Sequence, residues 1–183
     1  MDNIHGMNIK KILIVLVLIP FAGYPAHAQT RDTESGFFQQ GFGDLTEELE
    51  IAREEGKKGV FVMFDDKDCP WCAKMKSTVL NQIEVQEYYR KFFRITRIDR
   101  NGDALITDFN GNEITEKDFA DKTRVRATPV MIFYDLQGHP MYRHTGASRN
   151  VKEFLWMGEF VTEEKYKTQR FTVYKRQKKK VEK

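Results

Sequence analysis

Two cysteines constrain this chain more than any other feature. Cys69 and Cys72 are the only cysteines among the 183 residues, and only Pro70 and Trp71 separate them. A disulfide across so short a loop stabilises a fold by only about 2 kcal/mol, because the loop that it closes loses little entropy. A chain of this length does not need so weak a link. The pair is therefore better explained by its chemistry than by stability.

The residues around the pair predict a strand followed by a helix. Gly59–Phe64 is almost continuously apolar, as in a strand that is covered on both faces. Pro70 suits the first position of a helix, where its missing N–H costs nothing. Cys72 and Met75 then share a helix face that we expect to be buried. Cys69 is expected at the exposed tip of the helix, with Cys72 facing inward.

This placement predicts thiol–disulfide chemistry. A helix N-terminus lowers the pKa of a thiol such as that of Cys69, because unpaired N–H groups and a partial positive charge stabilise the thiolate. The Cys69 thiolate would attack a disulfide, and Cys72 would resolve the mixed disulfide. Pro70 and Trp71 would tune the direction of exchange. Structural zinc needs four ligands, and covalent haem attachment needs a histidine where this chain has Ala73. We expect no metal and no cofactor.

Periodicity and turn residues predict the remaining elements. They are a helix capped by Asp44 and stopped at Gly56, a helix over 85–92, a strand over 93–99, a hairpin over 104–115 with a type I′ turn at Asn110-Gly111, a helix over 116–124, strands over 130–134 and 141–145 around a turn at Gly138, and a last helix capped by Ser148. The acidic residues of the first helix, Glu48 among them, are expected to face solvent.

Thr128-Pro129 stands directly before the strand over 130–134. Most X-Pro bonds are trans, and this dipeptide alone favours the trans form. A cis proline would instead remove a backbone donor and leave a strand edge for a substrate peptide. The residues alone leave these two alternatives open.

The chain resembles the thioredoxin superfamily in three motifs: the Cys69-to-Cys72 site after a buried strand, Ala127-Thr128-Pro129 before a later strand, and Gly138 in the final hairpin. More narrowly, it resembles the periplasmic SoxW-type thioredoxin-like proteins. They share the Cys-Pro-aromatic-Cys-x-x-Met pattern, which ends here at Met75, and an inserted hairpin and helix, here about 101–124. The resemblance covers about residues 36–175.

The resemblance implies an α/β thioredoxin-like fold, in which a mixed central sheet is flanked by helices. It implies a cis peptide bond between Thr128 and Pro129. It also implies a reversible Cys69–Cys72 disulfide with Cys69 attacking and Cys72 resolving, supported by Pro70, Trp71, Thr128 and Pro129.

One position departs from the pattern of cytosolic thioredoxins. Those proteins carry a buried aspartate six residues before the first cysteine, where it accepts the proton of the resolving thiol. The matching residue here is Met63. A nearby carboxylate, Asp65 or Asp66, or a water molecule must then take its place.

The first 28 residues are organised like a signal peptide. Lys10-Lys11 precedes the apolar run Ile12–Ile19, and Ala26-His27-Ala28 fits the small-x-small cleavage rule. The run is too short to span a membrane comfortably. We expect cleavage after Ala28 and export to a periplasm; an uncleaved membrane anchor is the alternative.

Four regions follow from these observations: a signal peptide at 1–28, a flexible polar N-terminus at 29–35, a thioredoxin-like domain at 36–162, and a basic extension at 163–183. The extension holds nine Lys or Arg residues and three Glu. This composition is typical of a solvated helix or a disordered end, and weak contact with an anionic surface or an acidic partner is the other interpretation. The whole chain carries only +3, which does not indicate nucleic-acid binding.

These features predict an exported thiol–disulfide oxidoreductase, a monomer, that reduces or exchanges disulfides of periplasmic proteins. Reduction there would need electrons from a membrane dithiol donor. A disulfide oxidase or isomerase is the closest variant, although an isomerase usually needs a dimer and a substrate cleft. A non-catalytic thioredoxin-fold binding module or metal carrier is the alternative from a different class.

Overall fold

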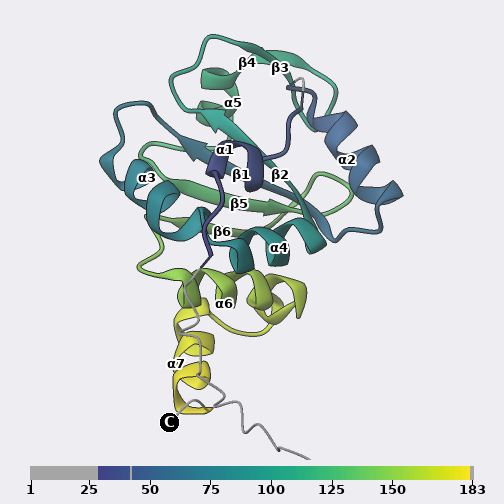
Figure 1. Cartoon of the computed structure of the whole chain (residues 1–183). Coiled ribbons are helices and arrows are strands. Elements are labelled where there is room, and N and C mark those ends of the chain that lie inside the picture. Colours follow the sequence, from purple (N-terminus) through teal and green to yellow (C-terminus); the bar gives the residue numbers. More distant parts are fainter. Residues whose placement is uncertain (1–28, 42, 182–183) are drawn as a thin grey trace, which may run out of the picture.

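The computed structural model describes residues 29–41 and 43–181 (Figure 1). The expected signal peptide and its cleavage site lie outside the described residues. In chain order the elements are α1 (Thr33–Gly36), α2 (Leu45–Glu54), β1 (Gly59–Asp65), α3 (Pro70–Met75), the π-helical segment η1 (Lys76–Leu80), α4 (Ile83–Phe92), β2 (Phe93–Asp99), β3 (Leu105–Thr107), β4 (Glu113–Thr115), α5 (Glu116–Lys122), β5 (Val130–Tyr134), β6 (Pro140–Thr145), α6 (Val151–Thr162), the 3₁₀ segment η2 (Lys165–Lys167) and α7 (Phe171–Val181).

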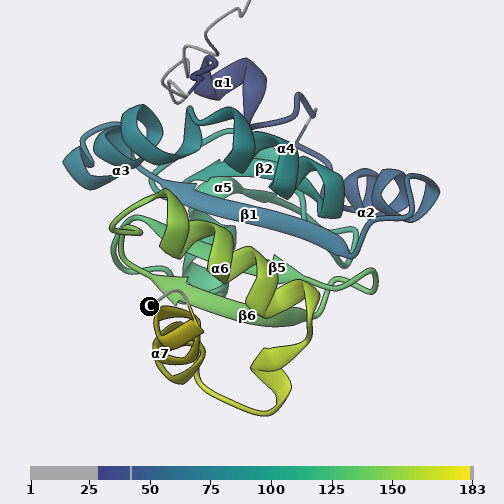
Figure 2. The same cartoon turned by 60° about the horizontal axis from the view of Figure 1, so that its bottom comes forward.

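A mixed four-stranded sheet forms the centre of the fold. Its strand order is β2-β1-β5-β6, with β1 parallel to β2 and antiparallel to β5, and with β5 antiparallel to β6. Helices α3, α4 and α6 pack on one face, and α2 and α5 pack on the other (Figures 1 and 2). The predicted fold class, a mixed sheet flanked by helices, is confirmed.

Strand β1 divides the core in two because successive side chains point to opposite faces. Phe61 and Met63 face the cysteines, α4 and α6, whereas Val62 belongs to the core under α2 and α5. Half of the buried residues in the cysteine-side core are aromatic. Tyr89 and Phe154 stack with their ring centroids 4.3 Å apart, which fixes α4 against α6.

The inserted hairpin, β3 and β4, and the helix α5 form as expected, but the turn differs from the prediction. A type I′ turn needs positive φ at both central residues, and of Asn110 and Gly111 only the glycine has it. The loop is organised instead by the buried Asp108 carboxylate, which accepts hydrogen bonds from Asn110 N (2.8 Å) and Asn112 N (3.0 Å) and pairs with Lys122. This carboxylate favours a wider loop over the two-residue turn.

Residues 29–35, predicted to be a flexible polar segment, form hydrogen bonds to the rest of the domain. Asp32 caps the short helix α1. The Thr33 hydroxyl donates to the Lys76 carbonyl at 2.7 Å, and Arg31 N donates to the Asn81 carbonyl at 2.7 Å. These polar groups find partners on and after η1, so the segment is attached next to the cysteine helix.

Two smaller predictions were also wrong. The N-cap of α6 is Asn150, whose side chain accepts from Glu153 N at 2.9 Å, and not Ser148. Glu48 is only 3% exposed and lies 2.7 Å from the Arg94 guanidinium. Arg94 stands on β2 opposite α2, so the carboxylate turns inward to meet it.

The basic C-terminal segment folds onto the domain. Phe171 and Tyr174 are buried against Phe160 of α6, with ring centroids 5.3 and 5.4 Å away, and Figure 2 shows α7 beside α6 and β6. On its polar side, Lys175 reaches Glu153 at 3.2 Å and Lys178 reaches Glu159 at 2.6 Å. Several of the lysines therefore neutralise acids of α6. None of the helices in the described part of the chain is long and apolar enough to cross a membrane.

Candidate active site

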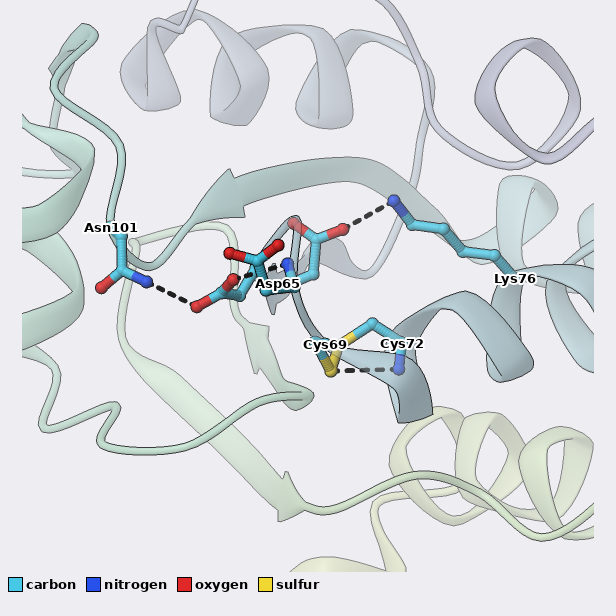
Figure 3. The surroundings of a disulfide bond; sticks show 7 residues. Asp65, Cys69, Cys72, Lys76 and Asn101 are labelled. Carbon is cyan, nitrogen blue, oxygen red and sulfur yellow. Dashed lines mark hydrogen bonds and ion pairs between the residues drawn. A yellow bond between two sulfur atoms is a disulfide. The ribbon is translucent and has the colours of Figure 1, made fainter.

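The two cysteines lie where β1 passes into α3. Cys69 is the N-cap of α3 and Pro70 its first residue, as predicted. Cys69 and Cys72 form a disulfide (Figure 3). The Cys72 backbone N–H donates to the Cys69 sulfur at 3.1 Å. The start of the helix thus directs a polarised N–H at the first sulfur.

The burial of Cys72 confirms its predicted inward position, whereas the predicted exposure of Cys69 was wrong. Cys72 is 2% exposed and belongs to the core with Met75, as expected. Cys69 is 8% exposed and does not form an exposed tip. Its sulfur is bonded to the inward-facing Cys72, which draws it toward the core. The two residues between the cysteines, Pro70 and Trp71, are both exposed, and Trp71 is 60% exposed.

A groove runs beside the disulfide. Trp71, Lys74, Met75 and Thr78 line one side, and the Thr128-Pro129 dipeptide and residues 146–149 line the rest of a space of about 430 Å³. The Thr128-Pro129 peptide bond is cis, so the conformation that the resemblance implied is confirmed. The Pro129 carbonyl accepts from Gly146 N at 2.9 Å, which holds the loop after β6 against the proline. The fold therefore brings Trp71 and Pro129 to one groove.

A buried carboxylate lies next to the disulfide. Asp65 is the last residue of β1, two after Met63, so it points to the same face of the sheet as the cysteines. It is 5% exposed, and its Oδ2 lies 2.6 Å from Lys76 Nζ (Figure 3). Burial raises the pKa of Asp65, although the hydrogen bond and charge of Lys76 act in the opposite direction.

Lys76 is a residue of this site that the sequence reasoning missed. It follows Cys72 by four positions, so both residues lie on one face of the helix. Its ammonium group also lies 3.1 Å from Glu34 in the N-terminal helix α1. The combination of an i, i+4 cation after the second cysteine and an aspartate that ends the preceding strand could have suggested the pair.

Asp66, the other carboxylate that the sequence offered, has different partners. Its side chain accepts from Asp68 N at 2.8 Å and from the amide of Asn101, which follows β2 (Figure 3). Asp66 is thus used to shape the loop between β1 and α3. The structure places Asp65, and not Asp66, in the buried network beside the disulfide.

The protein side chains offer no evident metal site near the cysteines. In the described ranges, no group of three or more His, Cys, Asp or Glu residues could hold a metal ion.

Comparison with known proteins agrees with this architecture. A thioredoxin-fold protein from Helicobacter pylori superposes with a TM-score of 0.61 at 19% identity, covering 84% of this chain and 98% of that one. A thioredoxin from Thermus thermophilus gives 0.54 at 22% identity, covering 69% and 88%. A putative disulphide-isomerase from Bacteroides thetaiotaomicron gives 0.52 at 23% identity, covering 69% and 96%.

At these identities the structural matches support the fold alone. No curated protein matches the chain. The family model of the thioredoxin-like domain matches residues 45–162, which is more than half of the sequence and includes both cysteines and Pro129. The chain therefore belongs to the thioredoxin-like domain family.

Proposed function

We propose that this protein is an exported thiol–disulfide oxidoreductase that reduces or exchanges disulfides in periplasmic proteins. The observation that carries the proposal is the Cys69–Cys72 disulfide at the start of α3, beside the groove that Trp71 and cis Pro129 line. A pair placed only for stability would not need an adjoining groove.

In the reductive direction, the reduced protein begins with a Cys69 thiolate. The Cys72 N–H that donates to the Cys69 sulfur would favour this charged form, because a hydrogen bond to an ionised group lowers its pKa. The thiolate attacks one sulfur of the target disulfide. A Cys69–target bond forms, the target disulfide breaks, and its second sulfur leaves as a thiolate that takes a proton from solvent.

Cys72 completes the reaction. Its thiol loses a proton, and its sulfur attacks the Cys69 sulfur, which breaks the mixed disulfide and restores the Cys69–Cys72 bond. The target leaves as a second thiolate and takes up a proton. Two electrons have then passed from the protein to the target, and another dithiol must supply two electrons for the next cycle.

Asp65 is the residue of this chain best placed to accept the Cys72 proton. It points to the sheet face that bears Met63 and the cysteines, and it is buried beside the disulfide. A carboxylate whose pKa is raised by burial is a better proton acceptor than an exposed one, because its pKa lies closer to that of a thiol. We assign the proton to Asp65 by way of a water molecule, with Lys76 holding the carboxylate in place.

The cis proline gives an extended target segment a place to lie. Proline has no backbone N–H, and the pairing of β5 with β1 begins at Val130, opposite Phe64. Thr128 is therefore beyond the sheet ladder, at the edge of the groove. This arrangement supports a role for Thr128 and Pro129 in holding the target segment, with Trp71 on the opposite side of the groove.

Export and the electron source are further parts of the proposal. The signal-peptide organisation of residues 1–28 supports a periplasmic location. Reduction in that compartment calls for a membrane dithiol donor. The likeness to SoxW-type proteins stays a prediction, because the matched family model describes the wider thioredoxin-like domain.

The exported protein should reduce insulin disulfides, and its reduction potential should indicate the direction of exchange. A potential near −270 mV would support a reductase, and one near −120 mV an oxidant. A Cys72→Ser variant should trap target proteins through Cys69, whereas a Cys69→Ser/Cys72→Ser control should trap none. A protein that neither reduces insulin nor traps any target would instead be the non-catalytic binding module.

A further inference from the structure

We infer that the groove beside the disulfide selects extended target segments with acidic side chains next to the reactive cysteine. This inference rests on the proposed function and names the class of substrate. The juxtaposition that carries it is an exposed indole, a cis proline and two cations that pair with no carboxylate among the described residues, all around one space next to the Cys69-to-Cys72 motif.

The charge of the groove has one sign. Ten residues line it, and among them Lys74 and Arg149 are charged. Both are exposed and stand on different walls: Lys74 on α3, and Arg149 on the segment that leads into α6. A segment lying between these walls would meet a positive potential from both sides, which favours carboxylates.

Lys74 is held at the groove rather than drawn away from it. Its ammonium group lies 5.7 Å from the centroid of the Trp71 ring, a cation–π contact. In the part of the chain that the structure describes, neither Lys74 nor Arg149 pairs with a carboxylate. Lys76, two residues along, is by contrast bound to Asp65 and Glu34.

The acidic residues that precede Cys69 lie outside the lining of the groove. Neither Asp66 nor Asp68 lines it, and the Asp66 carboxylate binds Asn101 and Asp68 N on the loop (Figure 3). Arg126, exposed two residues before Thr128, adds a further positive charge near the cis proline. The charged residues that line the groove, and Arg126 beside the cis proline, are therefore all cations.

The apolar lining restricts the target further. Trp71 exposes an aromatic surface, and Met75, Pro129 and Ala147 also face the same space. An indole face binds apolar side chains and peptide planes with a small cost in conformational entropy. The groove thus fits an extended segment that combines an apolar residue with flanking Asp or Glu residues.

The test compares three disulfide-containing peptides that differ only in having Glu, Gln or Lys on both sides of the cysteine. The reduced Cys72→Ser variant reacts with each peptide, and the rate of mixed-disulfide formation is measured in single turnover. Reaction of the same peptides with 2-mercaptoethanol, a neutral thiol, corrects for their intrinsic reactivity.

Two exposed ion pairs correspond to roughly a two- to thirty-fold preference for the Glu peptide over the Lys peptide at low salt. The preference should fall toward one at about 0.5 M salt, because salt screens exposed charges. Lys74→Gln/Arg149→Gln should remove it, and Lys74→Glu/Arg149→Glu should reverse it. Lys117→Gln/Arg176→Gln changes the net charge equally at exposed positions away from the groove and should leave the preference unchanged.

The outcomes separate the inference from the proposed function. Equal corrected rates for the three peptides, or an equal loss of preference in the Lys117/Arg176 control, would overturn the selectivity and leave the oxidoreductase intact. If none of the peptides reacts with the protein while 2-mercaptoethanol reacts with all of them, the proposed function fails and the inference fails with it. A rate for the Gln peptide that is unchanged in the groove variants shows that those variants keep their fold.

Discussion

Replacing Asp65 with asparagine tests the proton path at the disulfide. The substitution keeps the size of the side chain and one oxygen that can face Lys76, but it removes the proton acceptor. The Lys76 ammonium group keeps Glu34 as a counter-charge at 3.1 Å. The expected result is a slower resolving step, in which Cys72 attacks the mixed disulfide, and an unchanged first attack by Cys69.

The size of the effect follows from thiol ionisation. A cysteine with the ordinary pKa of about 8.5 is only about 3% thiolate at pH 7. If Cys72 depends on Asp65 to lose its proton, Asp65→Asn should slow resolution by up to about 30-fold at pH 7. The deficit should shrink as pH rises and vanish above about pH 9, where the thiol ionises without help.

The assay is a stopped-flow measurement of resolution from pH 6 to pH 10. Cys69 is preloaded with a fluorescent thiol, and its release by Cys72 is followed. Asp66→Asn is the matched control, because it removes a neighbouring carboxylate that is bonded to Asn101 and stands outside the buried pair. Superimposable pH profiles for the wild type and Asp65→Asn would refute the assignment.

Stability provides a second readout with a defined sign. Because the folded-state pKa of Asp65 is raised by burial, its contribution to folding is fully present below the unfolded value of about 4 and is lost as pH rises through the folded pKa. Asparagine does not titrate. The stability of Asp65→Asn relative to the wild type should therefore increase between pH 3 and pH 7 in urea unfolding, while resolution slows. If Asp65→Asn lost activity because it unfolded, it would instead be less stable than the wild type at neutral pH.

Three further predictions concern the fold around the site. Glu48→Gln should lower the free energy of unfolding by about 3 kcal/mol, because it leaves the Arg94 guanidinium buried without its carboxylate; the reduction potential should not change. Asp108→Asn should cost about 2 kcal/mol. Burial opposes ionisation of Asp108, but hydrogen bonds from Lys122 and Asn112 outweigh it and hold the pKa of Asp108 far below its usual range. The stability that the ionised Asp108 adds is therefore present above about pH 4 and is lost as pH falls through the lowered pKa. Acid unfolding of the wild type and of Asp108→Asn should show this difference. Phe171→Ala should release α7 from Phe160 and Tyr142 and speed amide exchange in α7 by at least about tenfold without changing the potential; equal exchange would contradict the packing role.

Local patterns predicted the parts of the fold that short stretches of chain determine. The bounds of β2 agree with the prediction, and β1 extends one residue further. The apolar run that follows Gly59 and the aspartate that ends each strand are local features, so they need no distant information. The N-terminal position of Cys69 and the inward face of Cys72 follow from Pro70 and helical spacing. The cis bond at Thr128-Pro129 was predictable only through the family resemblance, since a lone X-Pro dipeptide favours trans.

The errors occur where a partner far along the chain decides the outcome. The local sequence around Glu48 is typical of an acid that faces solvent. Its burial depends on Arg94, 46 residues later, which binds its carboxylate. The hydrogen bonds of polar residues 29–35 could not be predicted locally, because their acceptors lie on Lys76 and Asn81. The Asn110-Gly111 turn looks like type I′ until Lys122 stabilises a wider loop around Asp108. Each of these features depends on tertiary contacts that cannot be inferred from local periodicity.

Helical spacing along α3 and η1 separates the two tasks that the proposed reaction needs. Trp71, Lys74 and Thr78, at i, i+3 and i+7, face the groove. Cys72 and Lys76, at i and i+4, face the core, where Lys76 joins Asp65 to the N-terminal helix through Glu34. Target selection and proton transfer therefore use opposite sides of one helix and share no ion pair. Because energetic effects of sites without shared partners are nearly additive, Asp65→Asn should leave the preference for acidic peptides intact, and Lys74→Gln should leave the pH profile of resolution unchanged. A strong coupling between the two substitutions would mean that peptide binding repositions the Asp65–Lys76 pair. Target selection and proton transfer would then depend on each other.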